Sequence, residues 1–406
     1  MSVKRQFFSN IIGIGFIDGL NLLIPLLTIP ILARVLDAEE YGVYLLITTI
    51  IMFGYTFVDY SSNYVGVRQL SQTTDSIEQG GIFLNHFFYR LLFSFLFIFI
   101  AFIVGTYIYN EQVVFLILSI GGPFLLGYAF TNTWFYIGTQ STYTLACFTV
   151  LAKVVHLIVI LLYVKSPDDL SLALHSLSIP TLLSGCALLF LIFSRYKVSF
   201  VNLTTMLNNA LEELREGGNV FIGLLAPNLY NTLPLVIAAA FYSKFDYALL
   251  ASAIKVASVI VIVQNILAKS VFPILSKKNK SHLKKVLIGN LFVAIAMLAA
   301  LLVIGEWVIT TFLGEQYKGA YNYLIVMAVS AIFIGIANTY GQGFLLANGK
   351  DKAYRNITVY CSITSGFIMF ASIYFFDLLG FVIGILAARL LLAASLYAAY
   401  RREIVT

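Results

Sequence analysis

Long apolar runs separated by short polar segments dominate the chain. A helix that crosses the hydrocarbon core of a bilayer needs about 20 apolar residues. Twelve runs approach or exceed that length, near residues 10–33, 42–60, 82–109, 113–137, 143–164, 171–194, 219–241, 248–272, 286–311, 321–347, 355–376 and 378–399. The pattern therefore predicts an all-α polytopic membrane protein with twelve transmembrane helices.

Basic residues are distributed unequally between the two sets of loops that alternate along these runs. One set holds sixteen lysines and arginines, and the other set holds only Arg34, Lys165, Lys244 and Lys318. Because cytoplasmic loops are enriched in basic residues, the rich set is predicted to face the cytoplasm. Both termini are then cytoplasmic, which also requires an even number of spans.

The longest polar stretch, 195–218, separates the sixth run from the seventh. It predicts two lobes of six helices, with helices 1–6 in 1–200 and helices 7–12 in 201–406. Sequence echoes support a duplication: Pro30 and Pro234 lie 204 residues apart, and Tyr41 and Tyr247 lie 206 apart. Halves of the same orientation predict pseudo-two-fold symmetry along the membrane normal, with a site between the lobes.

The composition excludes several function classes. Of the 406 residues, 60% are hydrophobic and 11% are charged, whereas a soluble domain has about 25% charged residues. A soluble enzyme, a disordered protein and a nucleic-acid binder are therefore excluded, despite a net charge of +6. The three cysteines form no C-x-x-C pair, and the four histidines have no metal-ligand spacing. No metal or cofactor is expected.

The N-terminal run and the glycine pairs are predicted to serve membrane structure. Lys4 and Arg5 precede the first run, which is too long for the apolar part of a signal peptide, so we expect a retained span. Gly15 and Gly19 lie four residues apart, as do Gly380 and Gly384. Small residues at this spacing let another helix approach closely.

Ionisable residues inside the apolar runs are the strongest functional signal. A charge at the bilayer centre costs at least about 2.5–3.5 kcal/mol, so such residues need partners or a wet cavity. A basic cavity favours an anionic cargo. The candidate cargo-binding residues are Lys255, Arg34, Lys153, Arg389, Arg90 and Asn231. Snorkelling of Arg90 to the interface is the alternative for that residue, and interhelical ion pairs are the alternative for Lys153, Lys255 and Arg389.

Two acidic residues are candidates for coupling transport to an ion gradient. Asp18 lies near the middle of the first run, and Asp59 lies near the end of the second. In the seventh run, Asn231 lies between Pro227 and Pro234, which interrupt the backbone hydrogen bonds of a helix. A bent helix with one polar side suits a pathway that opens and closes, although a simple packing kink has the same signature.

Four stretches along the chain form a recognisable set: Ile31–Tyr44, Trp134–Gly138, Val271–Ser276 and Phe312–Tyr317. In their order and helix positions they resemble the motifs of O-antigen (Wzx-type) polysaccharide flippases of the multidrug/oligosaccharidyl-lipid/polysaccharide exporter superfamily. The chain has Asp37–Ala38 where that family usually has Gly-Pro. The resemblance implies a MATE-like fold, with a cavity lined mainly by helices 1, 2, 7 and 8. That would place Asp18, Arg34, Asp59 and Lys255 near the cavity.

The same resemblance implies an inner-membrane transporter that moves undecaprenyl-pyrophosphate-linked oligosaccharide to the periplasmic leaflet. It further implies alternating access, a coupling ion (proton or sodium), contact with membrane lipid, and a polysaccharide polymerase and chain-length regulator as candidate partners. Alternatives are a multidrug exporter or an exporter of another lipid-linked precursor. A membrane polymerase or ligase of lipid-linked sugars is a third alternative, but it would need a larger periplasmic loop than this chain offers.

Overall fold

The computed structural model describes residues 24, 27–198, 203–275, 280–348 and 350–405, and within these ranges the chain is helical with no strand. The first half contains α2 (Ala38–Asp59), α3 (Val65–Gln72), α4 (Ser76–Ile108), α5 (Glu111–Leu116), α6 (Gly122–Thr131), α7 (Thr133–Gly138), α8 (Thr142–Tyr163) and α9 (Leu170–Arg195). The second half contains α10 (Leu203–Leu225), α11 (Asn228–Asn231), α12 (Leu233–Phe241), α13 (Lys244–Leu275), α14 (Lys280–Phe312), α15 (Ala320–Tyr340), α16 (Asp351–Phe376) and α17 (Leu378–Val405).

Eleven segments within the described residues are long and apolar enough to cross a membrane. Each coincides with one of the predicted runs from the second to the twelfth. The first predicted run, 10–33, lies mostly outside the described residues, and of its positions only 24 and 27–33 are described. A total of twelve spans therefore stays a prediction.

Short polar side chains fix the starts of several spans. Asp37 Oδ1 accepts a hydrogen bond from the backbone N–H of Glu40 at 2.8 Å, at the start of α2. Asn110 Oδ1 does the same for Val113 at 3.0 Å, at the start of α5. Such caps satisfy N–H groups that have no partner inside the helix. The polar breaks between apolar runs therefore set the helix boundaries.

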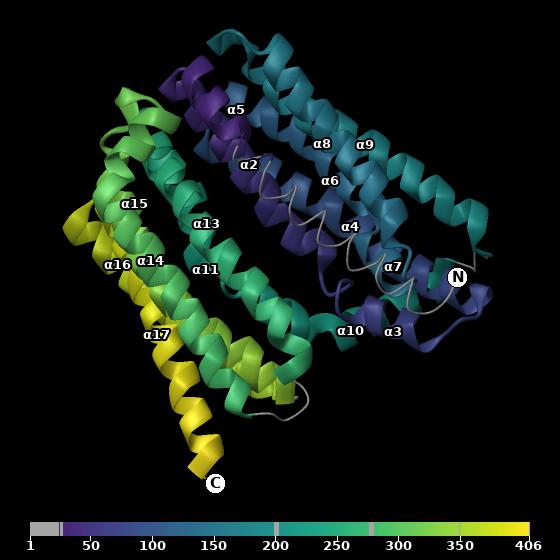
Figure 1. The fold of residues 1–406 in the computed structure, drawn as a ribbon. Helices are drawn as coiled ribbons and strands as arrows, with labels where there is room; N and C mark the ends of the chain where they lie inside the picture. The colour runs from purple at the N-terminus through teal and green to yellow at the C-terminus, as the bar shows by residue number, and fades with distance from the viewer. Residues whose placement is uncertain (1–23, 25–26, 199–202, 276–279, 349, 406) are drawn as a thin grey trace. The chain divides into compact units, whose positions relative to one another are not determined.

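The chain divides into two compact units, Met1–Phe221 and Ile222–Thr406. The predicted division at residue 200 is earlier, because the structure assigns most of α10 to the first unit. In this unit, α9 packs along α6 and α8 (Figure 1). Helix α2 is the most buried span of this unit, and α4 is the least buried, with its exposed residues mainly in 92–108. This exposure is what a lipid-facing helix requires.

The fourth span is not one straight helix. It runs through α5, a π-helical turn at Ile117–Gly121, α6 and α7. Asn132 separates α6 from α7 in the left-handed conformation, with φ of 45°. Asparagine is one of the few residues that tolerate this conformation. The short helix α7 after this break carries Trp134.

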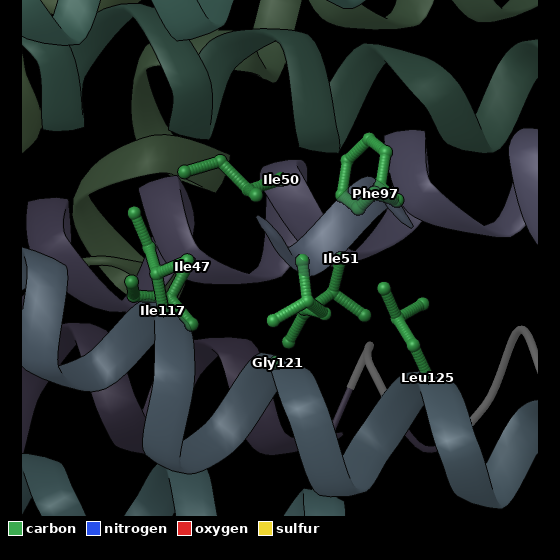
Figure 2. A pocket seen from close by; sticks show the side chains of 8 residues that line it. Ile47, Ile50, Ile51, Phe97, Ile117, Gly121 and Leu125 are labelled. Atoms are coloured by element: carbon green, nitrogen blue, oxygen red, sulfur yellow. The ribbon is translucent and has the colours of Figure 1, made fainter. Parts of the chain in front are cut away.

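The π-helical turn lies beside an apolar crevice in the first unit (Figure 2). The crevice is lined by Ile47, Ile50, Ile51, Phe97, Ile98, Ile117, Gly121 and Leu125. No charged or hydrogen-bonding side chain is among these residues. The crevice is therefore a place of helix packing and offers nothing to a phosphate or a sugar.

In the second unit, the main packing joins α17 to α15 and α16, and α15 to α13 and α14 (Figure 1). A Cβ atom at Gly380 would overlap the backbone of Ser372 on α16, and one at Gly384 would overlap Met369. The prediction that this glycine pair permits close helix approach is confirmed. Gly15 and Gly19 lie outside the described residues.

The seventh span is interrupted where the sequence places its two prolines. Helix α10 ends at Leu225, one turn forms α11, and α12 starts at Leu233. Asn231 lies in the interruption, between Pro227 and Pro234. The predicted break is confirmed.

Candidate functional site

A buried ion pair lies inside the first unit. Arg90 on α4 is 1% exposed, and its Nη1 lies 3.0 Å from Oδ1 of Asp59 at the end of α2. Asn63 Nδ2 donates a second hydrogen bond to Asp59 Oδ1, at 2.7 Å. The two opposite charges cancel inside the unit, which makes their burial tolerable.

Backbone and aromatic groups complete the surroundings of Arg90. Its Nη2 donates to the carbonyl oxygen of Tyr128 at 3.1 Å, and its guanidinium lies 5.1 Å from the centre of the Tyr128 ring. Tyr55 packs against the Tyr128 ring, with 4.0 Å between the two ring centres. Arg90 points inward to these partners, so the snorkelling alternative does not describe it.

Arg389, in the second unit, has a different environment. It lies half-buried on α17, where Nη1 donates to Ser330 Oγ at 2.8 Å and Nη2 donates to Asn231 Oδ1 at 3.3 Å. Both partners are neutral. Its buried Nε has no hydrogen-bond partner among the described residues. The structure thus brings together Arg389 and Asn231, two of the predicted site residues, without an acid from the described part of the chain.

Lys255 is the second intramembrane cation of this unit. It lies half-buried near the middle of α13. Its ammonium makes no hydrogen bond or ion pair with any described residue; the exposed Lys318, by comparison, lies 2.6 Å from Glu306. Lys255 therefore keeps its hydrogen-bond donors available within the part of the chain that the structure describes.

The remaining predicted residues are placed as follows. Arg34 is exposed at the end of the first helix, and Lys153 is half-buried on α8. His156, one turn after Lys153, is buried and lies 2.7 Å from Ser176 Oγ. Asp18 lies outside the described residues. Arg34 and Lys153 lie in the first unit and Lys255 lies in the second.

Sequence reasoning missed a second polar cluster in the first unit, centred on His86. This histidine is fully buried, with Nε2 2.9 Å from Gln69 Oε1 and 3.6 Å from Glu213 Oε2. Gln69 Nε2 donates to both carboxylate oxygens of Glu213, at 3.0 and 2.9 Å. Since Gln69 Oε1 can only accept, His86 Nε2 carries the hydrogen and Nδ1 accepts from Tyr89.

The Trp134 stretch forms a wall of this cluster. The Trp134 ring centre lies 4.5 Å from that of His86, and a Cβ atom at Gly66 of α3 would lie 2.6 Å from Trp134. A Cβ atom at Gly138 would similarly press on Leu70 at 2.8 Å. The aromatic–glycine pattern thus serves the packing of α7 on α3, which places Gln69.

A family model described as "Polysaccharide biosynthesis protein" matches residues 7–279, about two-thirds of the chain. The chain belongs to this family. Its multiple spans and its family make it a multi-pass membrane protein.

Two curated relatives carry the name "Putative O-antigen transporter". The one from Shigella dysenteriae is 25% identical over 393 residues, covering 94% of this chain and 97% of the relative. The one from Escherichia coli (strain K12) is 22% identical over 412 residues, covering 96% of each chain. These relatives span almost the whole chain, so the family likeness includes both units.

Solved structures with the same fold are membrane transporters. The lipid II flippase MurJ in an inward closed conformation superposes with a TM-score of 0.72 at 14% identity, covering 97% of this chain and 86% of that one. An inward-facing multidrug resistance MATE family transporter of the MOP superfamily gives 0.67 at 13% identity, covering 97% and 98%. The family model and the curated relatives confirm the predicted resemblance to polysaccharide and O-antigen transport proteins, and the fold is MATE-like.

Proposed function

We propose that the protein is a flippase for undecaprenyl-pyrophosphate-linked oligosaccharide, the repeat unit of an O-antigen. It moves this lipid from the cytoplasmic to the periplasmic leaflet of a bacterial inner membrane by alternating access, with both termini in the cytoplasm. Family membership, the names of the two curated relatives and the loop distribution of basic residues support the proposal.

One observation carries the cargo assignment: Arg389 and Lys255 lie within spans, and neither has an acid partner among the described residues. A charge at such a depth costs several kcal/mol. A diphosphate that binds there offsets this cost and is itself relieved of an unpaired charge in hydrocarbon. The sugars and diphosphate pass through the protein while the prenyl tail stays in lipid.

Arg389 has the chemistry for this task. A guanidinium has five N–H donors in a planar fork that matches phosphate oxygens. Ser330 accepts a hydrogen bond from Nη1 and Asn231 accepts one from Nη2, and these two bonds fix the orientation of the guanidinium. The remaining donors can bind the diphosphate. Lys255 adds a compact charge, and Arg34 and Lys153 are further candidates along the path.

Ion coupling is the second part of the proposal. Asp59 already shares a hydrogen-bonded pair with Arg90, so Asp18 is the better candidate for a group that binds and releases a proton or a sodium ion. We expect Asp18→Asn to lower surface polysaccharide at least about tenfold, because an uncharged amide cannot take up the ion. Immunoblots of membranes control for the amount of protein. Full surface display in this variant would contradict coupling through Asp18.

Deletion with complementation tests the function. Loss of the gene should abolish long-chain surface polysaccharide and leave the lipid-linked repeat unit on the cytoplasmic face, and a plasmid copy should restore both. Accumulation on the periplasmic face would instead indicate a polymerase or ligase. Normal polysaccharide with altered drug sensitivity would indicate a multidrug exporter.

A further inference from the structure

One face of the linker helix α10 is buried on the first unit. Glu213 is 13% exposed at its side chain, and Ala210 and Gly217 are buried. These positions recur at the three- to four-residue spacing of one helical face. The residues between them, Leu211, Glu212, Arg215 and Glu216, are exposed. Although this segment is polar in sequence, it is therefore docked along one side.

Hydrogen bonds with long sequence separation hold this face. Gln69 Nε2 on α3 donates to both carboxylate oxygens of Glu213. The Tyr60 hydroxyl after α2 donates to the carbonyl oxygen of Leu214 at 2.9 Å. Hydrogen bonds to a charged group contribute more than neutral ones. Glu213 is accordingly the strongest single polar anchor of the helix.

Close packing continues the contact further along α10. The Phe221 ring stacks on Tyr60, with 4.4 Å between the ring centres and 19° between the planes. A Cβ atom at Gly217 would lie 2.9 Å from Cβ of Ser61. The backbone of α10 thus touches the segment after α2 directly, and only glycine fits at that point.

The boundary between the two units follows Phe221, and the helix ends soon after it. Helix α10 stops at Leu225, and Pro227 begins the interruption before α12. Two regions of the same span therefore differ: one is anchored through Glu213, and the next lacks a continuous backbone ladder.

We propose that Glu213 is a positioning residue that keeps α10 attached to the first unit throughout the transport cycle. The conformational change of the cycle then enters the span only after Phe221. The idea that there is a cycle rests on the proposed function, whereas the docking itself does not. The Gln69–His86 contact and the packing of α7 on α3 hold the docking surface in shape.

Hydrogen exchange of the full-length protein in lipid nanodiscs tests the docking without any cargo. Glu213→Ala should raise amide exchange in 207–221 at least about tenfold, because the charged anchor is lost. Glu212→Ala is the matched control, since Glu212 is exposed on the same turn; it should exchange like the wild type. Equal exchange in the two variants would overturn the role of Glu213.

A second variant covers the case that Glu213→Ala fails to fold. Tyr60→Phe keeps the ring against Phe221 and removes only the hydrogen bond to Leu214. We expect a several-fold rise in exchange in the same segment. Wild-type exchange in Tyr60→Phe would contradict the docking.

A reversible cross-link tests whether the contact persists during transport. Gln69→Cys and Glu213→Cys, in a chain whose three native cysteines are replaced by alanine, put thiols in place of two side chains that lie in hydrogen-bond contact. A short, reductant-cleavable cross-linker between the two thiols then replaces the polar anchor with a covalent one. In vesicles with lipid-linked oligosaccharide, cross-linked and wild-type protein should transport at rates within about twofold. Inactivity of the cross-linked protein that a reductant reverses would overturn the proposal. Inactivity of the cysteine-free parent would count against the proposed function, and exchange would still decide the docking.

Discussion

The two intramembrane arginines have opposite electrostatic surroundings. Arg90 in the first unit lies 3.0 Å from Asp59 and is 1% exposed, so its charge is neutralised within the fold. Arg389 in the second unit is half-buried and hydrogen-bonded to Ser330 and Asn231, which are neutral. The comparison teaches that the role of an arginine cannot be inferred from its position in an apolar run alone. We propose that its partner decides whether it stabilises the fold or binds an anionic cargo.

Breaking the pair in the first unit should have the largest effect on stability. Asp59→Asn leaves Arg90 without a counter-charge, which costs about 3–5 kcal/mol for a buried pair. Thermal unfolding in detergent should show a much lower midpoint. The double variant Asp59→Leu with Arg90→Leu should recover most of the loss. A single variant as stable as the wild type would show that the pair is not a structural element.

Removing the cation in the second unit should affect transport far more than stability. Ser330 keeps a 2.6 Å hydrogen bond to the carbonyl of Met327, and Asn231 keeps one to Pro227. We therefore expect Arg389→Met to shift stability by about 1 kcal/mol or less, while surface polysaccharide falls at least about tenfold. Arg389→Lys should recover part of the activity. A stability loss as large as that of Asp59→Asn would refute the distinction between the arginines.

Two substitutions of Lys255 test whether transport depends on a positive charge at this position. Lys255→Arg should largely keep transport, because it preserves a cation at the same depth. Lys255→Ala should lose it, because the positive charge is removed. Long-chain polysaccharide on the cell surface, normalised to the amount of membrane protein, is the measurement. Equal activity of the two variants would remove Lys255 from the cargo path.

The exposed ion pair of Lys318 and Glu306 should contribute least to the stability of the fold. Their 2.6 Å contact raises the pKa of the Lys318 ammonium, since the neighbouring carboxylate favours its charged form. Solvent screens this pair, so we expect Lys318→Met to leave the thermal midpoint unchanged. A clear drop in the midpoint would mean that exposure does not separate the two kinds of ion pair.

The spans were predictable because hydropathy acts locally. Each apolar run from the second to the twelfth became a candidate span, and the Pro227–Pro234 interruption and the close approach at Gly380 and Gly384 followed from the residues themselves. The π-helical turn in the fourth span left no comparable signal, since apolar residues fill it as they fill an α-helix.

The site was less predictable because its contacts are distant in sequence. Asp59 and Arg90 were both identified as candidates, but their pairing depends on how α2 packs on α4. Gln69 and Glu213 lie 144 residues apart, and no spacing rule links them. The one available signal was a glutamate at the buried spacing of Ala210 and Gly217 within a polar linker.

Transport by purified protein in vesicles tests the central claim most directly. Wild-type protein and two double variants that remove equal charge, Lys255→Met with Arg389→Met and Lys318→Met with Lys350→Met, are supplied with undecaprenyl-pyrophosphate-linked oligosaccharide. We predict that the wild type and the variant that lost the exposed lysines move the lipid at similar rates, whereas the variant without intramembrane cations is at least about tenfold slower. Equal rates in the two double variants, or no movement by the wild type, would contradict the account.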